Sequence, residues 1–442
     1  MELFIDKNIF STKVLLKKNS KVFDFNYKFN NEKNYIENIY LGKIVNICKN
    51  IRAIFVDIGL KKNAYLDFND LSQKFNTNDF HVGKEIFVQV KKNPVDDKGA
   101  KISQDISIGF KNFVLLFNEK KILTSRKIKN KDFSDEIKSY FNKNFFGFGI
   151  IVRTKAENEN LNSLKKELEK INDLFKNIKK NKNYILKDRL VYENNNIYQK
   201  FINDYCQEIK KIVSNNKKII NSIKFENKEF NKKLDLFKTL KNQIDDKIYV
   251  EKGINLKFDY TEALTVIDVN SGKYISKRKK DGNYEINKIA LINIARLINI
   301  KNISGIIIID LINLKSNKKQ NKLINIFNSQ LKNYKVTTNV YGFTKLSLFE
   351  LTRKYESPSL FQMVYTKEDM QYKLSRKYLS DMIFSKLRRE ILNTNGDKFL
   401  IKTNKGLINY LKENKKFNKY FKGLNITLNY KKSDNNEIKH IF

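Results

Sequence analysis

The chain has 442 residues, which favours two to four domains over a single small core. It carries 87 Lys and Arg against 48 Asp and Glu, and a formal net charge of +39 points to a polyanionic partner, nucleic acid first. Lys, Asn and Ile are abundant throughout while there are only two Pro and no Trp. That pattern indicates genome-wide codon bias, so the charge supports nucleic-acid binding without being diagnostic of it.

The chain has few side chains that could carry catalysis. There are two histidines, His81 and His440, which argues against a nuclease with a histidine acid–base pair. The two cysteines, Cys48 and Cys206, form no CxxC pair, so neither a cysteine zinc site nor a disulfide framework is expected. No stretch predicts a signal peptide or a membrane span, so we expect a soluble protein. The groups that remain for catalysis are carboxylates acting with a hard metal ion.

The first hundred residues are predicted to be mostly strands. Residues 1–35 read as short strands, and residues 39–71 predict three more, separated by "KN" and "GLKKN". Residues 83–103 add two strands around a Pro-Asp-Asp-Lys-Gly loop. Five short strands at this spacing predict a small closed β barrel.

Two aromatic residues of this segment are candidates for stacking on bases. Phe55 and Tyr65 lie on neighbouring predicted strands, and exposed aromatic rings among cations suit single-stranded nucleic acid. The alternative is that both rings belong to the barrel core. The basic residues around them are Lys43, Arg52, Lys61, Lys62, Lys98 and Lys101.

The next segment contains a candidate phosphate clamp. Residues 146–160 predict a strand that ends at Arg153 and Thr154, followed by an amphipathic helix with apolar residues from Leu161 to Ile178. A guanidinium beside a hydroxyl suits one phosphate group, although such a pair at a strand end is more often ordinary surface. Downstream we expect a basic loop at 176–189 and two polar helices within 199–245.

A strand–helix–strand pattern follows. Residues 261–274, "TEALTVIDVNSGKY", predict a buried strand, residues 285–299 a helix, and residues 302–315, "NISGIIIIDLINLK", a continuous apolar strand. This order is typical of a βαβ unit in a sheet covered on both faces. The remaining expected elements are a helix at 317–334, a strand, a turn and a short helix at 334–354, and a tail with one helix and two or three strands from Ser375.

Both apolar strands end in an aspartate. Asp268 and Asp310 should emerge at the same edge of the sheet, and Asn270 should point to the same side as Asp268. Two carboxylates suit a hard cation such as Mg²⁺, which keeps several waters and binds substrate phosphate. The alternative is that each Asp merely caps the helix that follows its strand. The apolar strands favour the metal site slightly, because a carboxylate at a buried edge is costly unless paired.

These segments resemble the ribonuclease E/G family. "TEALTVIDVNSG" and "GIIIIDLINL", with "IARLINI" between them, are similar to its catalytic region. "IYLGKIVNICKNIRAIFVDIGLKKNAYL" and "KGAKIS" resemble its S1 RNA-binding domain. "GIIVRT" resembles the stretch with its 5′-monophosphate sensor, and "ELTRKYESPSL" the end of its DNase I-like subdomain. The motifs occur in order over nearly the whole chain.

The resemblance implies an α+β multidomain fold, with an S1 (OB-fold) β barrel inserted in a ribonuclease H-like subdomain. That subdomain would be made of two segments, residues 1–35 and 199–243. The other implied domains are S1 (36–107), 5′ sensor (108–198), a DNase I-like α/β catalytic subdomain (244–364), a link (365–374) and a small C-terminal oligomerisation domain (375–442).

The resemblance also implies an activity and its residues. The family consists of Mg²⁺-dependent endoribonucleases that cut single-stranded AU-rich RNA, often prefer a 5′-monophosphate end, and leave 5′-phosphate and 3′-hydroxyl products. By this resemblance Asp268 and Asp310 hold the metal, Asn270 aligns the site, and Arg153 and Thr154 hold the 5′ phosphate. The S1 face would use the aromatic pair Phe55 and Tyr65, with Lys98 and Lys101 near it. The expected roles are rRNA and tRNA processing and mRNA decay.

Three departures from the family pattern qualify these expectations. Asn313 stands where the family has a second Asp after the metal-binding one, which questions a supporting acid. Residues 359–373, "SLFQMVYTKEDMQYK", lack the family's zinc-link cysteines, so zinc is not expected and a homo-oligomer would need another contact. The long degradosome-scaffolding extension is absent, so the resemblance is to the short, ribonuclease G-like branch.

Two further expectations concern location and an alternative function. The composition fits a reduced bacterial genome or an organelle gene, and we expect the bacterial cytoplasm, with the plastid stroma as the alternative. The competing function is a non-catalytic S1-type RNA-binding protein of ribosome assembly. It would need the barrel and the charge but not the carboxylates.

Overall fold

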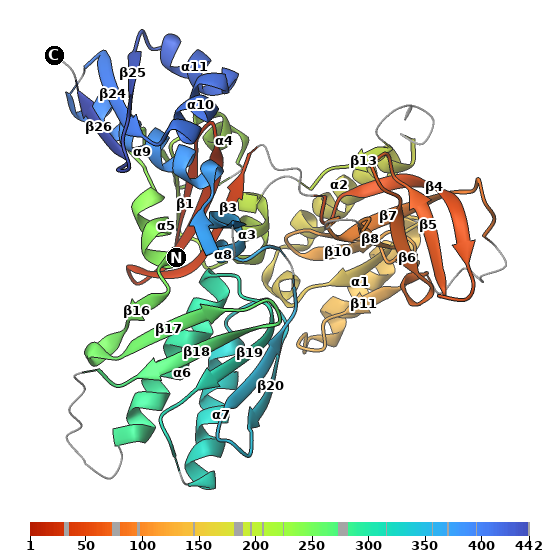
Figure 1. The fold of residues 1–442 in the computed structure, drawn as a ribbon. Coiled ribbons are helices and arrows are strands. Elements are labelled where there is room, and N and C mark those ends of the chain that lie inside the picture. The colour runs from red at the N-terminus through yellow and green to blue at the C-terminus, as the bar shows by residue number, and fades with distance from the viewer. Residues whose placement is uncertain are drawn as a thin grey trace. The chain divides into compact units, whose positions relative to one another are not determined.

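The computed structural model describes two compact units (Figure 1). One combines Met1–Glu32 with Lys210–Phe442, and the other is Lys33–Ile209. The described residues are 1–30, 35–72, 80–94, 98–144, 146–180, 189–194, 197–205, 207–223, 225–272, 282–314, 316–355, 357–368, 371–394 and 396–440.

The unit Lys33–Ile209 begins with a closed five-stranded barrel. Its strands are β4 (Ile39–Cys48), β5 (Ala53–Asp57), β6 (Ala64–Asp67), β7 (Glu85–Lys92) and β8 (Lys101–Ser103). Their order is β4-β5-β6-β8-β7, and β7 pairs back with β4 to close the ring, while β13 (Leu190–Tyr192) pairs with β4 from outside. Alternate side chains such as Ile54, Val56 and Leu66 fill the interior. The predicted barrel is confirmed.

A four-stranded sheet with two long helices completes this unit. Its elements are β9 (Ser107–Gly109), β10 (Phe113–Leu116), β11 (Ile122–Thr124), α1 (Lys131–Asn144), β12 (Gly149–Val152), α2 (Leu161–Lys180) and α3 (Ile197–Tyr205). The strand order is β11-β12-β10-β9, and α1 and α2 share one apolar core with it. The predicted helix after Arg153 is confirmed. Of the expected basic loop, residues 176–180 belong to α2 and 181–188 lie outside the described residues.

The other unit starts with a sheet built from two distant stretches of the chain. Its elements are β1 (Glu2–Lys7), β2 (Ser11–Lys18), β3 (Lys21–Phe29), β14 (Lys211–Ser214), α4 (Lys217–Ser222), β15 (Lys228–Phe230) and α5 (Phe237–Ile244). The order is β15-β14-β1-β2-β3. In place of two polar helices, residues 199–245 contain most of α3, the short helices α4 and α5, and the strands β14 and β15. Ile212 and Val213, which favour a strand, are buried where β14 pairs in parallel with β1.

The strand–helix–strand pattern lies in a six-stranded mixed sheet. Its elements are β16 (Lys247–Tyr249), β17 (Asn255–Tyr260), β18 (Leu264–Asn270), α6 (Gly282–Ile300), β19 (Gly305–Asp310), α7 (Asn317–Leu331), β20 (Thr338–Phe343) and β21 (Phe349–Arg353). The order is β16-β17-β18-β19-β21-β20, and β18 and β19 are parallel. The short helix expected near the end of 334–354 is instead β21, where Phe349, Leu351 and Arg353 alternate inward.

In the part of the chain that the structure describes, helices cover one face of this sheet, not both as predicted. Ile267, Ile307 and Ile309 are fully buried in one core with α6 and α7, which lie behind the same face in Figure 1. On the opposite face Val266 is half-buried and Ile306 is 49% exposed. We call this second face the open face of the sheet. A continuous apolar sequence cannot distinguish a two-sided strand from one whose outer face stays accessible.

The chain ends in a small α/β module with three strands, where two or three were expected, and with two further helices in addition to the one expected helix. The elements after β21 are α8 (Leu360–Val364), β22 (Tyr365–Glu368), β23 (Gln371–Leu374), α9 (Arg376–Thr394), β24 (Lys398–Thr403), α10 (Lys405–Glu413), α11 (Lys415–Lys422), β25 (Thr427–Lys432) and β26 (Glu437–His440). The module's sheet has the order β25-β24-β26. The hairpin β22–β23 occupies the predicted link. Among the described residues, no helix is long and apolar enough to cross a membrane.

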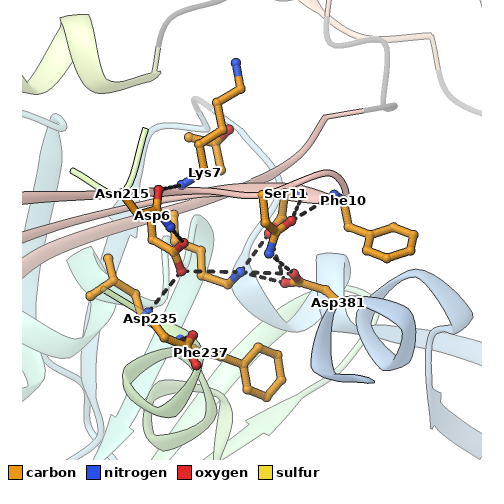
Figure 2. Close-up of polar contacts among 12 residues, drawn as sticks. Asp6, Lys7, Phe10, Ser11, Asn215, Asp235, Phe237 and Asp381 are labelled. Atoms are coloured by element: carbon orange, nitrogen blue, oxygen red, sulfur yellow. Dashed lines mark hydrogen bonds and ion pairs between the residues drawn. The ribbon is translucent and has the colours of Figure 1, made fainter. Parts of the chain in front are cut away.

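A buried ionic network joins this tail module to the N-terminal sheet (Figure 2). Asp381 of α9 is fully buried and accepts hydrogen bonds from Asn8 Nδ2 at 2.7 Å, Ser11 Oγ at 2.9 Å and Tyr27 OH at 3.0 Å. The ammonium of Lys13, also fully buried, lies 2.8 Å from its Oδ2. A buried carboxylate needs such partners, so these contacts hold α9 in place.

The second carboxylate of this network is Asp6 on β1. Its Oδ2 lies 3.9 Å from Lys13 Nζ, and its Oδ1 lies 3.5 Å from Arg388 Nη1 on α9. Burial raises the pKa of Asp6, and the Lys13 ammonium opposes that rise. Two cations thus balance two carboxylates, and of these four side chains only that of Arg388 is partly exposed.

Candidate functional site

Asp268 and Asp310 lie side by side at the end of two parallel strands. In the register of β18 and β19, Asp268 is paired with Asp310, as Ile267 is with Ile309. Neighbouring strands lie roughly 4.8 Å apart. Since Ile267 and Ile309 point into the core, the adjacent aspartates point to the open face, where Asp268 is half-buried and Asp310 exposed. The predicted convergence of the two carboxylates is confirmed.

Asn270 is tied directly to one of these carboxylates. Its Nδ2 donates a hydrogen bond of 2.6 Å to Asp268 Oδ2, and both residues lie on the open face. The strand then turns at Gly272, which has a φ of +57°. A Cβ there would lie 2.2 Å from the carbonyl oxygen of Gly253, so only glycine fits. The turn therefore ends the strand just beyond the amide.

The helix-capping alternative does not describe either aspartate. The N-cap of α7 is Ser316, whose side chain accepts a hydrogen bond from the backbone N–H of Lys319. Asp268 lies inside β18 and bonds to Asn270, while α6 begins only at Gly282. Neither carboxylate is therefore occupied in stabilising a helix start.

The oxygen ligands suit a hard cation better than a transition metal. Within the described ranges, no three His, Cys, Asp or Glu side chains cluster closely enough to hold a metal ion by themselves. Two adjacent carboxylates on an accessible face match the few protein ligands that Mg²⁺ takes, with waters and substrate oxygens completing its shell. Zinc would want nitrogen or sulfur ligands, and the described residues of the open face provide neither at this point.

A cation that the sequence did not suggest lies beside the carboxylates. Lys257 of β17 is the cross-strand partner of Asp268 and projects to the open face. Its Nζ forms an ion pair of 3.1 Å with Asp259 Oδ1, and both side chains are about half exposed. The sequence signal for this position was that Lys257 alternates with the apolar residues Leu256 and Phe258, which are buried in the structure.

Phe55 and Tyr65 lie outside the barrel core. They are paired across β5 and β6 with ring centroids 6.1 Å apart, and both are half-buried. Their neighbours Ile54, Val56 and Leu66 fill the interior, so the two rings form one aromatic patch on the barrel surface. The structure thus favours an outward-facing pair over the core alternative.

The two lysines predicted beside this patch differ in their contacts. Lys101 is in register with Tyr65, and its Nζ lies 2.8 Å from Asp70 Oδ2. That hydrogen bond raises the pKa of Lys101, so it remains a cation. Lys98 is exposed just before β8. Both can offer positive charge near the rings.

Arg153 and Thr154 occupy the end of β12, as predicted. The Arg153 guanidinium is partly exposed and its Nη1 lies 3.2 Å from Asp204 Oδ1 on α3. Thr154 begins a short 3-10 helix (Thr154–Asn158), and its hydroxyl is 2.8 Å from Ser125 Oγ. Asp204 and Ser125 were missed from the sequence because no local pattern links them to the strand. Asp204 holds the Arg153 guanidinium, and Ser125 holds the Thr154 hydroxyl.

The comparisons with known proteins point to one family of ribonucleases. A model of the ribonuclease E/G family matches residues 107–356. Ribonuclease G of Haemophilus influenzae is 24% identical over 93% of this chain and 92% of its own length. Ribonuclease G of Escherichia coli K12 is 25% identical over 74% of both chains. Ribonuclease E of a Synechocystis strain is 26% identical over 74% of this chain and 53% of its own.

Proposed function

The chain belongs to the ribonuclease E/G family. We therefore propose that it is an endoribonuclease that cleaves single-stranded RNA, with Asp268 and Asp310 in its active site. One observation carries the proposal: the two carboxylates are paired in register on an accessible sheet face, with Asn270 bonded to one of them. The finer points of the proposal are Mg²⁺ as the metal, AU-rich targets, a 5′-monophosphate preference, and roles in rRNA and tRNA processing and mRNA decay. A bacterial cytoplasmic location is a further part of the proposal, and the relatives reported above come from bacteria.

The proposed mechanism assigns a task to each side chain. Asp268 and Asp310 would hold Mg²⁺ through hard oxygen atoms, and Asn270 keeps the Asp268 carboxylate in one orientation through its 2.6 Å hydrogen bond. When bound, the ion supplies Lewis-acid stabilisation of the attacked phosphate and activates water. With water as the nucleophile the RNA 2′-hydroxyl takes no part, so the proposed mechanism predicts 5′-phosphate and 3′-hydroxyl products.

The proposed domain assignment follows the predicted boundaries. The sheet that combines β1–β3 with β14 and β15 supports one ribonuclease H-like subdomain made from 1–35 and 199–243. The closed barrel supports the S1 domain at 36–107, and the sheet with α6 and α7 supports the catalytic subdomain at 244–364. We keep 108–198 as the 5′ sensor and 375–442 as the small C-terminal domain.

The test of this function is a cleavage time course. The protein is incubated with an AU-rich single-stranded oligonucleotide and, separately, with the same sequence as a duplex, in Mg²⁺ or in EDTA. We expect internal cuts in the single strand with Mg²⁺ only. Binding without cleavage in Mg²⁺ would instead favour a purely RNA-binding protein.

The aromatic patch yields a prediction about RNA affinity. Tyr65→Ala should weaken binding of a single-stranded oligonucleotide roughly 5- to 150-fold, because stacking contributes about 1–3 kcal/mol per base. Fluorescence anisotropy in EDTA measures binding without cleavage. Ile51→Ala, in the adjacent β4–β5 turn, removes an exposed apolar side chain and serves as the control. Equal losses for both variants would count against stacking.

The Arg153 site yields a prediction about substrate ends. Arg153→Ala should slow cleavage of a 5′-monophosphorylated RNA roughly 10-fold or more, since it removes charge-assisted hydrogen bonds to the phosphate. The 5′-hydroxyl version of the same RNA should be cut at an unchanged rate. Lys170→Ala, an exposed cation on α2, is the control for lost charge. A similar loss on both substrates would refute the sensor role.

A further inference from the structure

A buried amide on α6 holds the backbone immediately after Asp310. Asn287 has no exposed surface, and its Nδ2 donates to the carbonyl oxygen of Ile312 at 2.7 Å. Its Oδ1 accepts a hydrogen bond of 3.0 Å from the backbone N–H of the same residue. One side chain therefore satisfies both backbone groups of a residue two positions beyond the carboxylate.

This double contact continues the sheet beyond its last paired residue. The pairing of β19 with β18 ends at Asp310, so the backbone after it has no strand to hold its direction among the described residues. A side-chain amide offers one donor and one acceptor in the arrangement that a neighbouring strand would offer. A second amide one helical turn earlier adds to it: Asn283 Nδ2 donates to the carbonyl oxygen of Asn313 at 3.0 Å.

The two carboxylates differ in what orients them. Asp268 is held by Asn270, whereas no hydrogen bond to the Asp310 carboxylate comes from any residue that the structure describes. The direction of the Asp310 side chain therefore depends on its backbone. That backbone is fixed on one side by β18 and on the other by the contact of Asn287 with Ile312.

Packing alone would not call for asparagine at this position. The neighbouring buried residues of α6 are apolar, namely Ile286, Ala290 and Leu291, and all belong to the core of the sheet. An amide placed among them is costly unless it is fully hydrogen-bonded. Here the amide of Asn287 is hydrogen-bonded to the backbone of Ile312 through both its nitrogen and its oxygen.

We propose that Asn287 is a positioning residue that sets the orientation of Asp310 and so the affinity of the site for its metal ion. The inference rests on the proposed role of Asp310. It assigns to the first turns of α6 a role in catalysis, exerted through the segment 311–313 without contact with substrate.

The test compares Asn287→Ala with Asn299→Ala. Asn299 is also buried on α6, and its Oδ1 accepts a hydrogen bond of 3.0 Å from Arg353 Nη2, away from Asp310. We expect Asn287→Ala to lower kcat roughly 10- to 100-fold with KM for RNA unchanged. Its affinity for Mn²⁺, measured without RNA by electron paramagnetic resonance, should fall, and the Ile312 amide should exchange faster with deuterium. Asn299→Ala should alter thermal stability only.

Asn283→Ala decides the question if Asn287→Ala does not fold, because Asn283 is exposed. It should lower kcat roughly 2- to 10-fold through the loss of one hydrogen bond. Unchanged kcat and Mn²⁺ affinity in Asn287→Ala, or in Asn283→Ala if only that variant folds, would overturn the inference. If Asp310→Asn is inactive in the same assays, the proposed function survives that outcome. If Asp310→Asn is as fast as wild type, the function itself fails.

Discussion

Asp310→Asn is expected to reduce kcat by about 10³-fold or more while single-stranded RNA still binds. The amide keeps the shape of the side chain but removes the charge that a divalent ion needs, and metal stabilisation of the transition state contributes several kcal/mol. Single-turnover cleavage and anisotropy in EDTA measure the two properties separately. Because the strand pairing does not depend on the side chain, the fold should be unchanged.

Two companion variants sharpen this prediction. Asp268→Asn should lower kcat to a similar level. The double variant should have a kcat no lower than either single variant, because the two residues act as one unit. Glu251→Gln removes an exposed carboxylate that pairs with Lys21 and contacts neither aspartate, and it should cleave normally. Additive losses in the double variant would indicate that the aspartates do not share a metal ion.

Asp381→Asn is expected to lower the thermal midpoint of the unit that contains α9 by roughly 6–20 °C. Lys13 would then stay buried with only Asp6, 3.9 Å away, and removing one partner of a buried pair costs about 3–5 kcal/mol. Differential scanning calorimetry measures the shift. Arg389 lies on the same helix as Asp381 and forms a partly exposed ion pair with Asp235. Arg389→Ala breaks this pair and should change the thermal midpoint little.

The double variant Lys13→Met with Asp381→Asn provides the decisive comparison. It leaves Asp6 with Arg388 and no unpaired buried charge, so it should be more stable than the sum of the two single losses implies. If the single variants were each as stable as wild type, the ionic network would not fasten the tail module.

The convergence of Asp268 and Asp310 could be predicted because the signal is local. Each Asp directly follows an apolar run, and a helix between the runs forces a crossover that brings parallel strands to one edge. The five-stranded barrel was predictable for a similar reason, since short strands and their turns alternate regularly. In both places the local pattern and the tertiary pairing agree.

The sequence could not reveal features that depend on distant partners. Lys13 and Asp381 are 368 positions apart, and Arg153 finds Asp204 51 positions away. Arg353 is 4% exposed at the inner face of β21, where it bonds to Asn299 and to the carbonyl oxygen of Ile303. Because an arginine is usually exposed, Arg353 hides the alternation of inward residues in β21. The segment was therefore predicted as a short helix, and the β20–β21 hairpin was missed.

The buried amide of α6 shows a different limit. Asn287 interrupts an apolar helix face, and from the sequence such a residue could be exposed, unpaired or structural. Only its two hydrogen bonds to the backbone of Ile312, seen in the structure, indicate a role for Asn287. The hydrophobic pattern locates the helix correctly, but it carries no information about the backbone that the amide contacts.

End-group analysis of the cleavage products tests the central claim most directly. A 5′-monophosphorylated AU-rich oligonucleotide is incubated with wild type and with Asp310→Asn in Mg²⁺, and the new termini of the fragments are identified by mass spectrometry. We predict internal cuts with 5′-phosphate and 3′-hydroxyl ends from wild type and none from the variant. Fragments with 2′,3′-cyclic phosphate ends, or equal cleavage by Asp310→Asn, would contradict a metal-dependent site at Asp268 and Asp310.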